Sequence, residues 1–206
     1  MRFDRCKKLF SKFDKLKKLK ILIVGVGGVG GYALDCLYKS GVCDITIVDF
    51  DKFDITNQNR QIGSEFVGEY KVEVLKKIYP GIKAINKKIT PENIDELNLN
   101  EYDIIVDAID DLKSKIALIK AREAKNIISS MGAAKRVDPT QIRVDKLKNT
   151  HTDPFARRLR QLLKEYKDLK VVFSTEKPIE CDMGSFVAVT GAFGFTICSE
   201  ILKDFV

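Results

Sequence analysis

The feature that constrains this chain most is a glycine-rich segment placed directly after a short apolar run. Residues 20–24 (Lys-Ile-Leu-Ile-Val) have the length and composition of a buried strand, and residues 25–30 (Gly-Val-Gly-Gly-Val-Gly) follow at once. Residues 32–40 have helical spacing and end at Gly41, and residues 45–49 form a second apolar run. This order predicts a βαβ unit with parallel strands, in which backbone N–H groups of the glycine turn can approach a phosphate.

The alternation of apolar runs and helical segments continues along the chain. We expect strands at 82–86, 102–108 and 126–131 and helices at 68–79, 91–97 and 112–124. Beyond residue 132 we expect strands at 141–147 and 171–174 and helices at 153–167 and 185–202. The fold class predicted is α/β: a Rossmann-like, mostly parallel central sheet with helices on both faces and an antiparallel C-terminal extension.

We expect residues 1–206 to form a single ATP-binding domain. We expect an N-terminal helix within residues 1–19, because residues 2–17 carry apolar side chains at the spacing of an amphipathic helix. Residues 20–131 form the nucleotide-binding core, and residues 132–206 add strands and helices on the substrate side.

Composition narrows the class of protein. Of 206 residues, 45% are hydrophobic, which excludes a disordered chain. There are 36 Lys and Arg against 29 Asp and Glu, a net charge of +7, which indicates an anionic partner or simply a lysine-rich solvated surface. No apolar run reaches the roughly 20 residues that span a bilayer, so we expect no membrane association. The five cysteines lack C-x-x-C spacing and are interpreted as reduced thiols in a cytoplasmic protein.

The glycine turn and the acid after it predict a site for a nucleotide. The candidate phosphate-binding residues are Gly25, Gly27, Gly28 and Gly30. Asp49 ends the next strand, where a carboxylate can bind ribose hydroxyls. The pattern alone does not choose between NAD and ATP, and a tight turn without a ligand is the alternative.

Polar residues past the second strand favour ATP. Asn57 and Arg60 lie in a polar segment, and Lys71 opens the next helix, so both cations can reach phosphates at the same sheet edge. Asp107 and Asp110 lie at the end of the strand 102–108, at that edge, where a carboxylate suits Mg²⁺. The alternative for Asp110 is an N-cap of the following helix.

The histidine and cysteine residues bear on whether the chain belongs to other enzyme classes. The single histidine, His151, is expected in a surface loop, which removes support for a typical hydride-transfer dehydrogenase. Cys181, in a loop-like stretch, is the one cysteine that stays open as a nucleophile.

The motifs together resemble a known family. The residues that carry the resemblance are Gly25-x-Gly-Gly-x-Gly30, Asp49-x-Asp51, Asn57-x-Asn59-Arg60-Gln61, Lys71 and Val106-Asp-Ala-Ile-Asp110. They are similar to the ubiquitin-activating-enzyme-like adenylating family, the ThiF, MoeB and HesA group. The resemblance implies that a carboxylate attacks ATP to give an acyl-adenylate and pyrophosphate. It implies that the glycines cradle the phosphates, Asp49 binds the ribose and Asp110 helps to hold Mg²⁺, while Asn57, Arg60 and Lys71 contact the triphosphate.

A narrower resemblance rests on five segments: Arg2-Phe-Asp-Arg5 with Leu9, Asn59-Arg60-Gln61-Ile62, Asp138-Pro-Thr-Gln-Ile142, the helix from Asp153-Pro154 through Arg157 and Leu159-Arg160, and Val172-Phe-Ser-Thr-Glu176. These are similar to the branch of the family that dehydrates threonylcarbamoyladenosine in tRNA. It implies adenylation of the threonyl carboxylate, ring closure with release of AMP, a homodimer and a possible sulfur-transfer protein partner. The segments 61–70 and 176–181 are shorter than that branch leads us to expect.

A tRNA substrate would use basic side chains in the 153–167 segment. The candidate RNA contacts are Arg157, Arg158, Arg160 and Lys164, together with Lys167. The alternative is a solvated basic face.

Two other functions stay open. The chain could adenylate the C-terminal glycine of a ubiquitin-like sulfur carrier, although the missing C-x-x-C pairs and the basic helix favour tRNA. An NAD-binding Rossmann protein is disfavoured by Arg60, Lys71 and Asp110.

Overall fold

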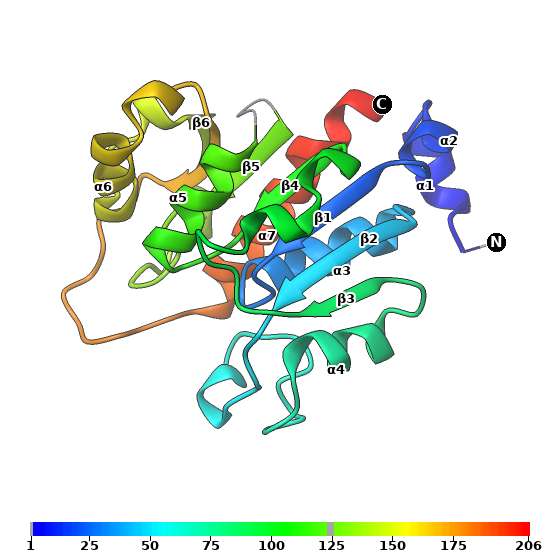
Figure 1. The fold of residues 1–206 in the computed structure, drawn as a ribbon, viewed down its shortest axis with the longest axis horizontal. Coiled ribbons are helices and arrows are strands. Elements are labelled where there is room, and N and C mark those ends of the chain that lie inside the picture. The colour runs from blue at the N-terminus through cyan, green and yellow to red at the C-terminus, as the bar shows by residue number, and fades with distance from the viewer. Residues whose placement is uncertain (1, 123–125) are drawn as a thin grey trace.

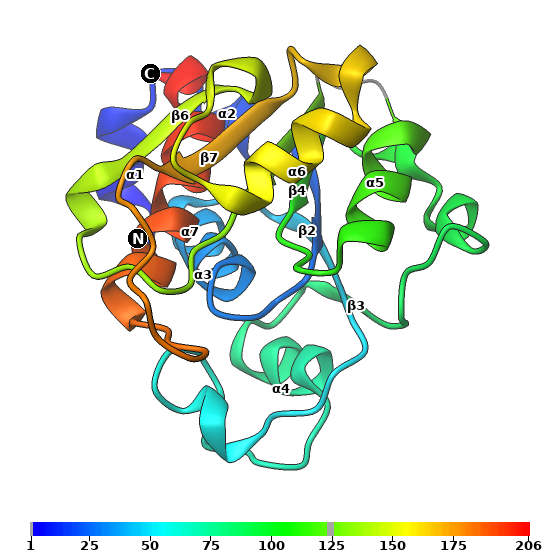
Figure 2. The same ribbon diagram turned by 90° about the vertical axis from the view of Figure 1, so that its left-hand side faces the viewer.

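The computed structural model describes residues 2–122 and 126–206, which form a seven-stranded sheet covered by helices on both faces (Figures 1 and 2). The strands are β1 (Lys20–Val24), β2 (Asp44–Asp49), β3 (Lys83–Asn86), β4 (Ile104–Asp107), β5 (Ile127–Ser130), β6 (Ile142–Lys146) and β7 (Lys170–Ser174). Their order across the sheet is β3-β2-β1-β4-β5-β7-β6, and every neighbouring pair is parallel except β6 and β7. The predicted fold class is therefore confirmed, including the antiparallel extension.

The helices separate into two layers. They are α1 (Asp4–Leu9), α2 (Phe13–Leu16), α3 (Gly30–Ser40), α4 (Lys71–Ile78), α5 (Leu112–Ala121), α6 (Pro154–Leu162) and α7 (Val187–Leu202). Apolar side chains of α3, α4 and α7 pack in one core with one face of the sheet, while those of α5 and α6 pack in a second core on the other face. None of the described helices is long and apolar enough to cross a membrane.

Strand β1 explains why the sheet needs helices on both sides. Ile21 and Ile23 belong to the core under α3 and α7, whereas Leu22 and Val24 belong to the core under α5 and α6. Successive side chains of a strand point to opposite faces, so a continuous apolar run is buried only between two helical layers.

The N-terminal helix expected over residues 2–17 is wrong, because the segment forms two short helices. Phe10 ends α1 in an extended conformation. The Lys12 backbone N–H donates to the carbonyl of Phe205 at 3.0 Å. The C-terminus lies beside α1 and α2 in Figure 1, and this contact interrupts the helix. The apolar spacing alone would continue the helix through this point.

Four other helices are shorter than predicted. α4 begins at Lys71 rather than residue 68, because Gly68 N–H donates to the Phe53 carbonyl (2.8 Å) and Lys71 N–H to the Asp51 carbonyl (3.0 Å). The stretch 91–97 forms only a 3₁₀ turn, Ile94–Leu97. α6 stops at Leu162 instead of residue 167, and a separate 3₁₀ turn, Lys164–Tyr166, follows. α5 ends at Ala121, and positions 123 and 124 of its predicted range lie outside the described residues.

Candidate active site

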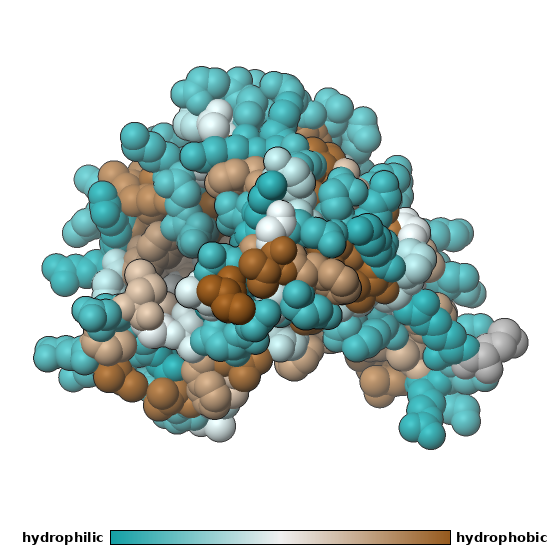
Figure 3. Space-filling model, turned by 90° about the horizontal axis from the view of Figure 1, so that it is seen from below, coloured by the Kyte–Doolittle hydropathy of each residue, from teal (hydrophilic) through white to brown (hydrophobic). Residues whose placement is uncertain are grey.

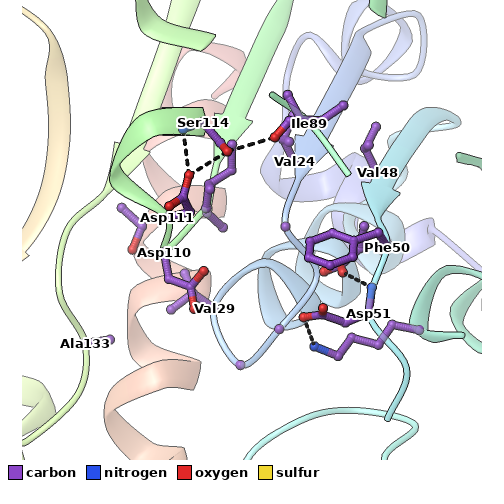
Figure 4. A pocket seen from close by; sticks show the side chains of 18 of the residues that line it. Val24, Val29, Val48, Phe50, Asp51, Ile89, Asp110, Asp111, Ser114 and Ala133 are labelled. Atoms are coloured by element: carbon purple, nitrogen blue, oxygen red, sulfur yellow. Dashed lines mark hydrogen bonds and ion pairs between the residues drawn. The ribbon is translucent and has the colours of Figure 1, made fainter. Parts of the chain in front are cut away.

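A cavity of about 1060 Å³ opens where β2, β1, β4 and β5 end. In the space-filling view from below, a hollow is visible on this face (Figure 3). Figure 4 looks into the cavity: Asp110 lies on one side, Phe50 and Asp51 on the other, and Val29 of the glycine turn between them. Parallel strands place their carboxyl ends at one edge, which is where open α/β sheets bind ligands.

The glycine turn is shaped by close backbone packing. Gly25 has φ +87°, and a Cβ atom there would lie 2.6 Å from the carbonyl oxygen of Ala108. A Cβ atom on Gly30 would lie 1.9 Å from the carbonyl oxygen of Gly25. These two glycines are therefore required by packing, whereas Gly27 and Gly28 line the cavity. The turn leads into α3, whose N-terminus attracts anions.

Asp49 holds the glycine turn in place. Its Oδ2 accepts a hydrogen bond from the Val26 backbone N–H at 2.8 Å, and its Oδ1 accepts one from the Asp51 backbone N–H at 2.9 Å. The carboxylate is buried but lines the cavity. Each oxygen keeps a second acceptor position, so the same group can also accept from ribose hydroxyls.

Arg60 and Lys71 bring two cations to the cavity. Arg60 Nη1 donates to the Thr56 carbonyl (2.9 Å) and to Asn59 Oδ1 (2.8 Å). Lys71 is buried, and its Nζ lies 3.0 Å from Oδ2 of the half-exposed Asp51. Both side chains line the cavity and are anchored by neighbouring groups, which places positive charge where phosphates would bind.

Asn57 has a different position from these cations. Its Oδ1 accepts from the Asp54 backbone N–H at 3.1 Å and so caps the 3₁₀ turn Ile55–Asn57. Neither Asn57 nor Gly30 is among the residues that line the cavity. A direct contact between Asn57 and the triphosphate stays a prediction.

Two adjacent aspartates after β4 have separate roles. Asp111 caps α5: its Oδ2 accepts from the backbone N–H and the hydroxyl of Ser114 at 2.8 and 2.7 Å. These hydrogen bonds hold the pKa of the Asp111 carboxyl below its usual value. Asp110 is exposed and lines the cavity. The N-cap alternative raised for Asp110 therefore applies to Asp111 and leaves Asp110 available to a ligand.

The wall of the cavity opposite Asp110 is apolar. It is formed by Val24, Val48, Phe50 and Ile89, all labelled in Figure 4. The ammonium of Lys88 lies 5.2 Å from the centre of the Phe50 ring. An apolar wall beside an aromatic ring suits a nucleotide base, and the sequence analysis did not single it out.

A buried ion pair that the sequence analysis missed lies beneath the site. Lys115 Nζ lies 2.7 Å from Asp107 Oδ2 and donates to the Ser130 carbonyl at 3.0 Å; both ionic side chains are fully buried. Burial lowers the pKa of Lys115, and Asp107 opposes that shift. Asp107 Oδ1 also accepts from the backbone N–H of Ile109, which precedes Asp110. The pair thus joins the ends of β4 and β5. The expectation that Asp107 could hold Mg²⁺ at this edge is wrong, because its carboxylate is fully buried against Lys115 and does not line the cavity. A sequence signal existed, because Lys115 shares helical spacing with buried Leu118 and Ile119.

A second buried pair supports the far wall of the cavity, where Ala133 lies beyond Asp110 (Figure 4). Arg136 Nη2 lies 3.2 Å from Asp153 Oδ2, and Arg136 Nη1 donates to the Ala134 carbonyl at 3.1 Å. Asp153 caps α6 by accepting from the backbone N–H groups of Phe155 and Ala156. Burial raises the pKa of Asp153, while these hydrogen bonds and Arg136 oppose the shift. The pair fixes residues 132–134 against the start of α6.

The basic side chains predicted to contact RNA are not equivalent. Arg157 and Arg158 are exposed on α6. Arg160 is half-buried and donates through Nη1 to the carbonyl (2.7 Å) and hydroxyl of Thr150. Lys164 lies beyond the end of α6 in the next turn.

The remaining candidates lie away from the reacting groups. His151 is exposed, with its ring packed edge-on against Phe173, as expected for a loop residue. Cys181 is an exposed free thiol in the loop before α7, and it is not among the lining residues. Cys36 and Cys198 hydrogen bond between α3 and α7, which raises the pKa of Cys198.

Comparisons with known proteins match almost the whole chain. The sequence model of the ThiF family matches residues 7–205. A tRNA threonylcarbamoyladenosine dehydratase of Bacillus subtilis is 38% identical over 161 residues, 72% of this chain, and the match covers 63% of that relative's length. The enzyme of the same name from Escherichia coli is 33% identical over 215 residues, with 84% of this chain and 80% of the relative covered. The crystal structure of E. coli tRNA N6-threonylcarbamoyladenosine dehydratase in complex with ATP superposes with a TM-score of 0.92 at 34% identity, covering 99% of this chain and 93% of that one.

Proposed function

The chain belongs to the ThiF family, as its motifs predicted, and from this premise we propose that it uses ATP to dehydrate threonylcarbamoyladenosine in tRNA. The observation that carries the proposal is convergence. Seven of the nine predicted nucleotide-binding residues line one cavity: Gly25, Gly27, Gly28, Asp49, Arg60, Lys71 and Asp110. We infer the substrate from relatives of this chain, which are named as dehydratases of this nucleoside.

The residues of the cavity divide the work of adenylation. Backbone N–H groups of the glycine turn hold the phosphates, and Asp49 holds the ribose. A carboxylate oxygen of the substrate attacks the α-phosphorus while the bond to the β-phosphate oxygen breaks, so negative charge grows on the leaving pyrophosphate. Arg60 and Lys71 stabilise that charge from fixed positions, which is where such groups contribute most.

The second step is ring closure. The carboxylate is now an acyl-adenylate, and an oxygen of the same side chain attacks its carbonyl carbon and expels AMP. The net change is loss of one water from the nucleoside. Both partners belong to one molecule, so closure is effectively unimolecular and requires no cysteine of the protein.

Magnesium fits the same cavity. Asp110 presents an exposed carboxylate beside the glycine turn, and Mg²⁺ is commonly held by one or two carboxylates plus phosphate oxygens. When bound, the ion would neutralise charge on the phosphate oxygens. Asp110 is the residue we propose to hold it.

The partners and location extend the proposal. We propose a homodimer, because large apolar side chains are exposed on the surface, among them Phe66, Val67, Met183 and Phe186. A sulfur-transfer protein partner is implied by the family resemblance alone and stays a prediction. The free thiols of the cysteines favour a cytoplasmic location.

The test is a direct assay with ATP, Mg²⁺ and tRNA that carries threonylcarbamoyladenosine. Digestion and mass spectrometry should show a nucleoside lighter by one water, with AMP in equal amount. Arg60→Ala should lower the rate about 100- to 1000-fold, the range for loss of one charge-stabilising donor. Arg143→Ala, an exposed arginine on β6 that does not line the cavity, is the matched control and should keep the wild-type rate.

An unchanged nucleoside from folded, ATP-binding protein would refute the dehydratase function. The alternative, adenylation of a ubiquitin-like sulfur carrier, would then be tested by exchange of labelled pyrophosphate into ATP with such a carrier present. Carrier-dependent exchange without any reaction on tRNA would replace the proposal.

A further inference from the structure

A second cavity lies at the far end of α6. It has a volume of about 350 Å³ and is lined by Leu147, Lys148, Arg160, Leu163, Lys164 and Lys167. None of these residues lines the larger cavity of the candidate active site, which we call the reaction cavity. Leu147 and Leu163 are buried and form an apolar floor, so the cations stand around its rim. We call it the basic pocket.

The basic pocket concentrates the positive charge of the chain. Residues 146–170 carry eight Lys and Arg against three Asp and Glu, a net charge of +5 out of +7 for the whole chain. Composition alone left an anionic partner and a solvated surface equally open. The clustering of the charge around a cavity favours the anionic partner.

Three of the eight cations in residues 146–170 have ionic partners within the described part of the chain, among them Lys170, which lies 2.6 Å from Glu200. Lys148 lies 2.8 Å from Asp168, which also pairs with Lys146 at 3.2 Å. Lys164 and Lys167 are exposed and form no ion pair with any described residue. The pocket therefore presents two ammonium groups without a counter-charge.

Arg160 gives the pocket a fixed wall. Its Nη1 donates to the carbonyl and hydroxyl of Thr150, which holds the guanidinium against the turn after β6. The remaining N–H groups of the guanidinium can donate to a ligand, and a guanidinium fork matches phosphate oxygens. The pocket combines one oriented cation with two mobile ones.

Helix α6 connects the two cavities. Phe155, in its first turn, lines the reaction cavity, and Leu163, just past its end, lines the basic pocket. At 1.5 Å per residue the two positions are about 12 Å apart along the helix. An RNA strand whose nucleoside reacts in the reaction cavity would therefore have backbone phosphates at the basic pocket within a few nucleotides.

We propose that the basic pocket binds a backbone phosphate of the RNA substrate, a few nucleotides from the nucleoside that reacts. The inference rests on the proposed function, because it assumes that the reacting group belongs to RNA. It assigns separate tasks to the cations of this region: Arg160 orients the pocket, and Lys164 and Lys167 neutralise the phosphate. A lysine ammonium suits that task, since it is a mobile point charge that follows a flexible backbone.

The experiment compares tRNA binding and turnover by wild-type protein and by Lys164→Ala/Lys167→Ala across a series of salt concentrations. We expect the Kd for tRNA to rise about tenfold and the slope of log K against log salt to fall by between one and two, since about two phosphate contacts are lost. The affinity for ATP should stay at the wild-type value. Replacement by arginine, Lys164→Arg/Lys167→Arg, keeps the charges and should restore both the affinity and the slope.

The matched control is Lys17→Ala/Lys18→Ala. These lysines are also exposed and adjacent, but they lie at the end of α2, across the molecule from α6 in Figure 1. The control removes the same net charge and should leave the Kd for tRNA within about twofold of wild type. An equal loss in both double variants would show a general charge effect and overturn the proposed site.

The two proposals fail in different ways. Wild-type affinity and slope in Lys164→Ala/Lys167→Ala, with normal turnover of modified tRNA by the wild type, would overturn the basic pocket alone. A wild type that neither binds nor converts modified tRNA would overturn the dehydratase function and the RNA site with it.

Discussion

We propose that the reaction cavity and the basic pocket both bind phosphate, yet their charged groups are held differently. In the reaction cavity Asp49 accepts two backbone hydrogen bonds, and Lys71 is fixed 3.0 Å from Asp51. In the basic pocket Lys164 and Lys167 have no ionic partner among the described residues. The first site is rigid before any ligand arrives, and the second adjusts to its ligand.

This difference follows from what each site must do. Adenylation requires the α-phosphorus, the attacking oxygen and the leaving group in one geometry, so the groups around them must be placed in advance. An RNA backbone needs only to be held, and mobile point charges do this over a range of positions. Substitutions in the reaction cavity should therefore cause large losses, and those in the basic pocket graded ones.

The largest effect is expected from Gly30→Ala. The new Cβ atom would lie 1.9 Å from the Gly25 carbonyl oxygen, so the phosphate turn must move. A shift of about 1 Å at a reacting centre costs roughly 100-fold in rate, and we expect at least that loss in the dehydration assay.

Gly68→Ala is the control for Gly30→Ala. Gly68 has a positive φ of +89°, but a Cβ atom there meets nothing within 4 Å. It should lose about 1 kcal/mol of unfolding free energy through backbone strain and keep the wild-type rate. If both variants behaved alike, the reaction cavity would tolerate displacement and the contrast with the basic pocket would disappear.

The next-largest effect is a loss of unfolding free energy, which should differ between substitutions of two lysines near the reaction cavity. Lys115→Met leaves the fully buried carboxylate of Asp107 without its cation and should cost about 3–5 kcal/mol of unfolding free energy. Lys71→Met leaves Asp51, which is 49% exposed and can be hydrated, so the loss should stay below about 1 kcal/mol while the affinity for ATP falls. Urea unfolding measures both. Equal losses in the two variants would show that burial does not distinguish these ion pairs.

The smallest effect concerns the N-cap of α5. Asp111→Ala should lose about 1 kcal/mol of unfolding free energy, and Asp111→Asn, which can still accept from the Ser114 N–H, should lose less. Hydrogen bonds from Ser114 hold the pKa of Asp111 below its ordinary 3.8. The contribution of a carboxylate with a lowered pKa is complete above the unfolded pKa and is lost as pH falls through the folded one.

The pH dependence of the unfolding free energy tests whether the charge of Asp111 contributes to stability. The difference in unfolding free energy between wild type and Asp111→Ala should be constant above about pH 5 and shrink below pH 4. A difference that stayed constant down to pH 2 would mean that the charge of Asp111 makes no contribution.

The strands and the phosphate turn were predictable because their signals are local. The run 20–24 is too short for an isolated helix and is followed at once by glycines, so strand, turn and helix were set in one stretch. The boundaries of the helices could not be predicted, because they depend on hydrogen-bond partners that are distant in sequence. Lys12 donates to Phe205, and Gly68 donates to Phe53, and these bonds end or delay a helix that periodicity alone would extend.

Charge placement shows the same limit. The sequence displayed five cations after Asp153 and predicted them along one helix. In the structure α6 ends at Leu162, so Lys164 and Lys167 turn away with Leu163 to form the basic pocket, while Arg160 is tied to Thr150. Lys115 and Arg136, counted as ordinary surface charge in the composition, are buried partners of Asp107 and Asp153.

The sequence by itself determined the α/β class, the order of its strands and seven residues that line the reaction cavity, because each depends on residues within a few positions of one another. Tertiary structure decided which aspartate caps α5 and which faces the cavity, where the buried ion pairs lie, and that the basic segment closes around a second pocket. These depend on which chain segments meet across the sheet, and a buried charge is tolerated only where its partner from another segment is in place.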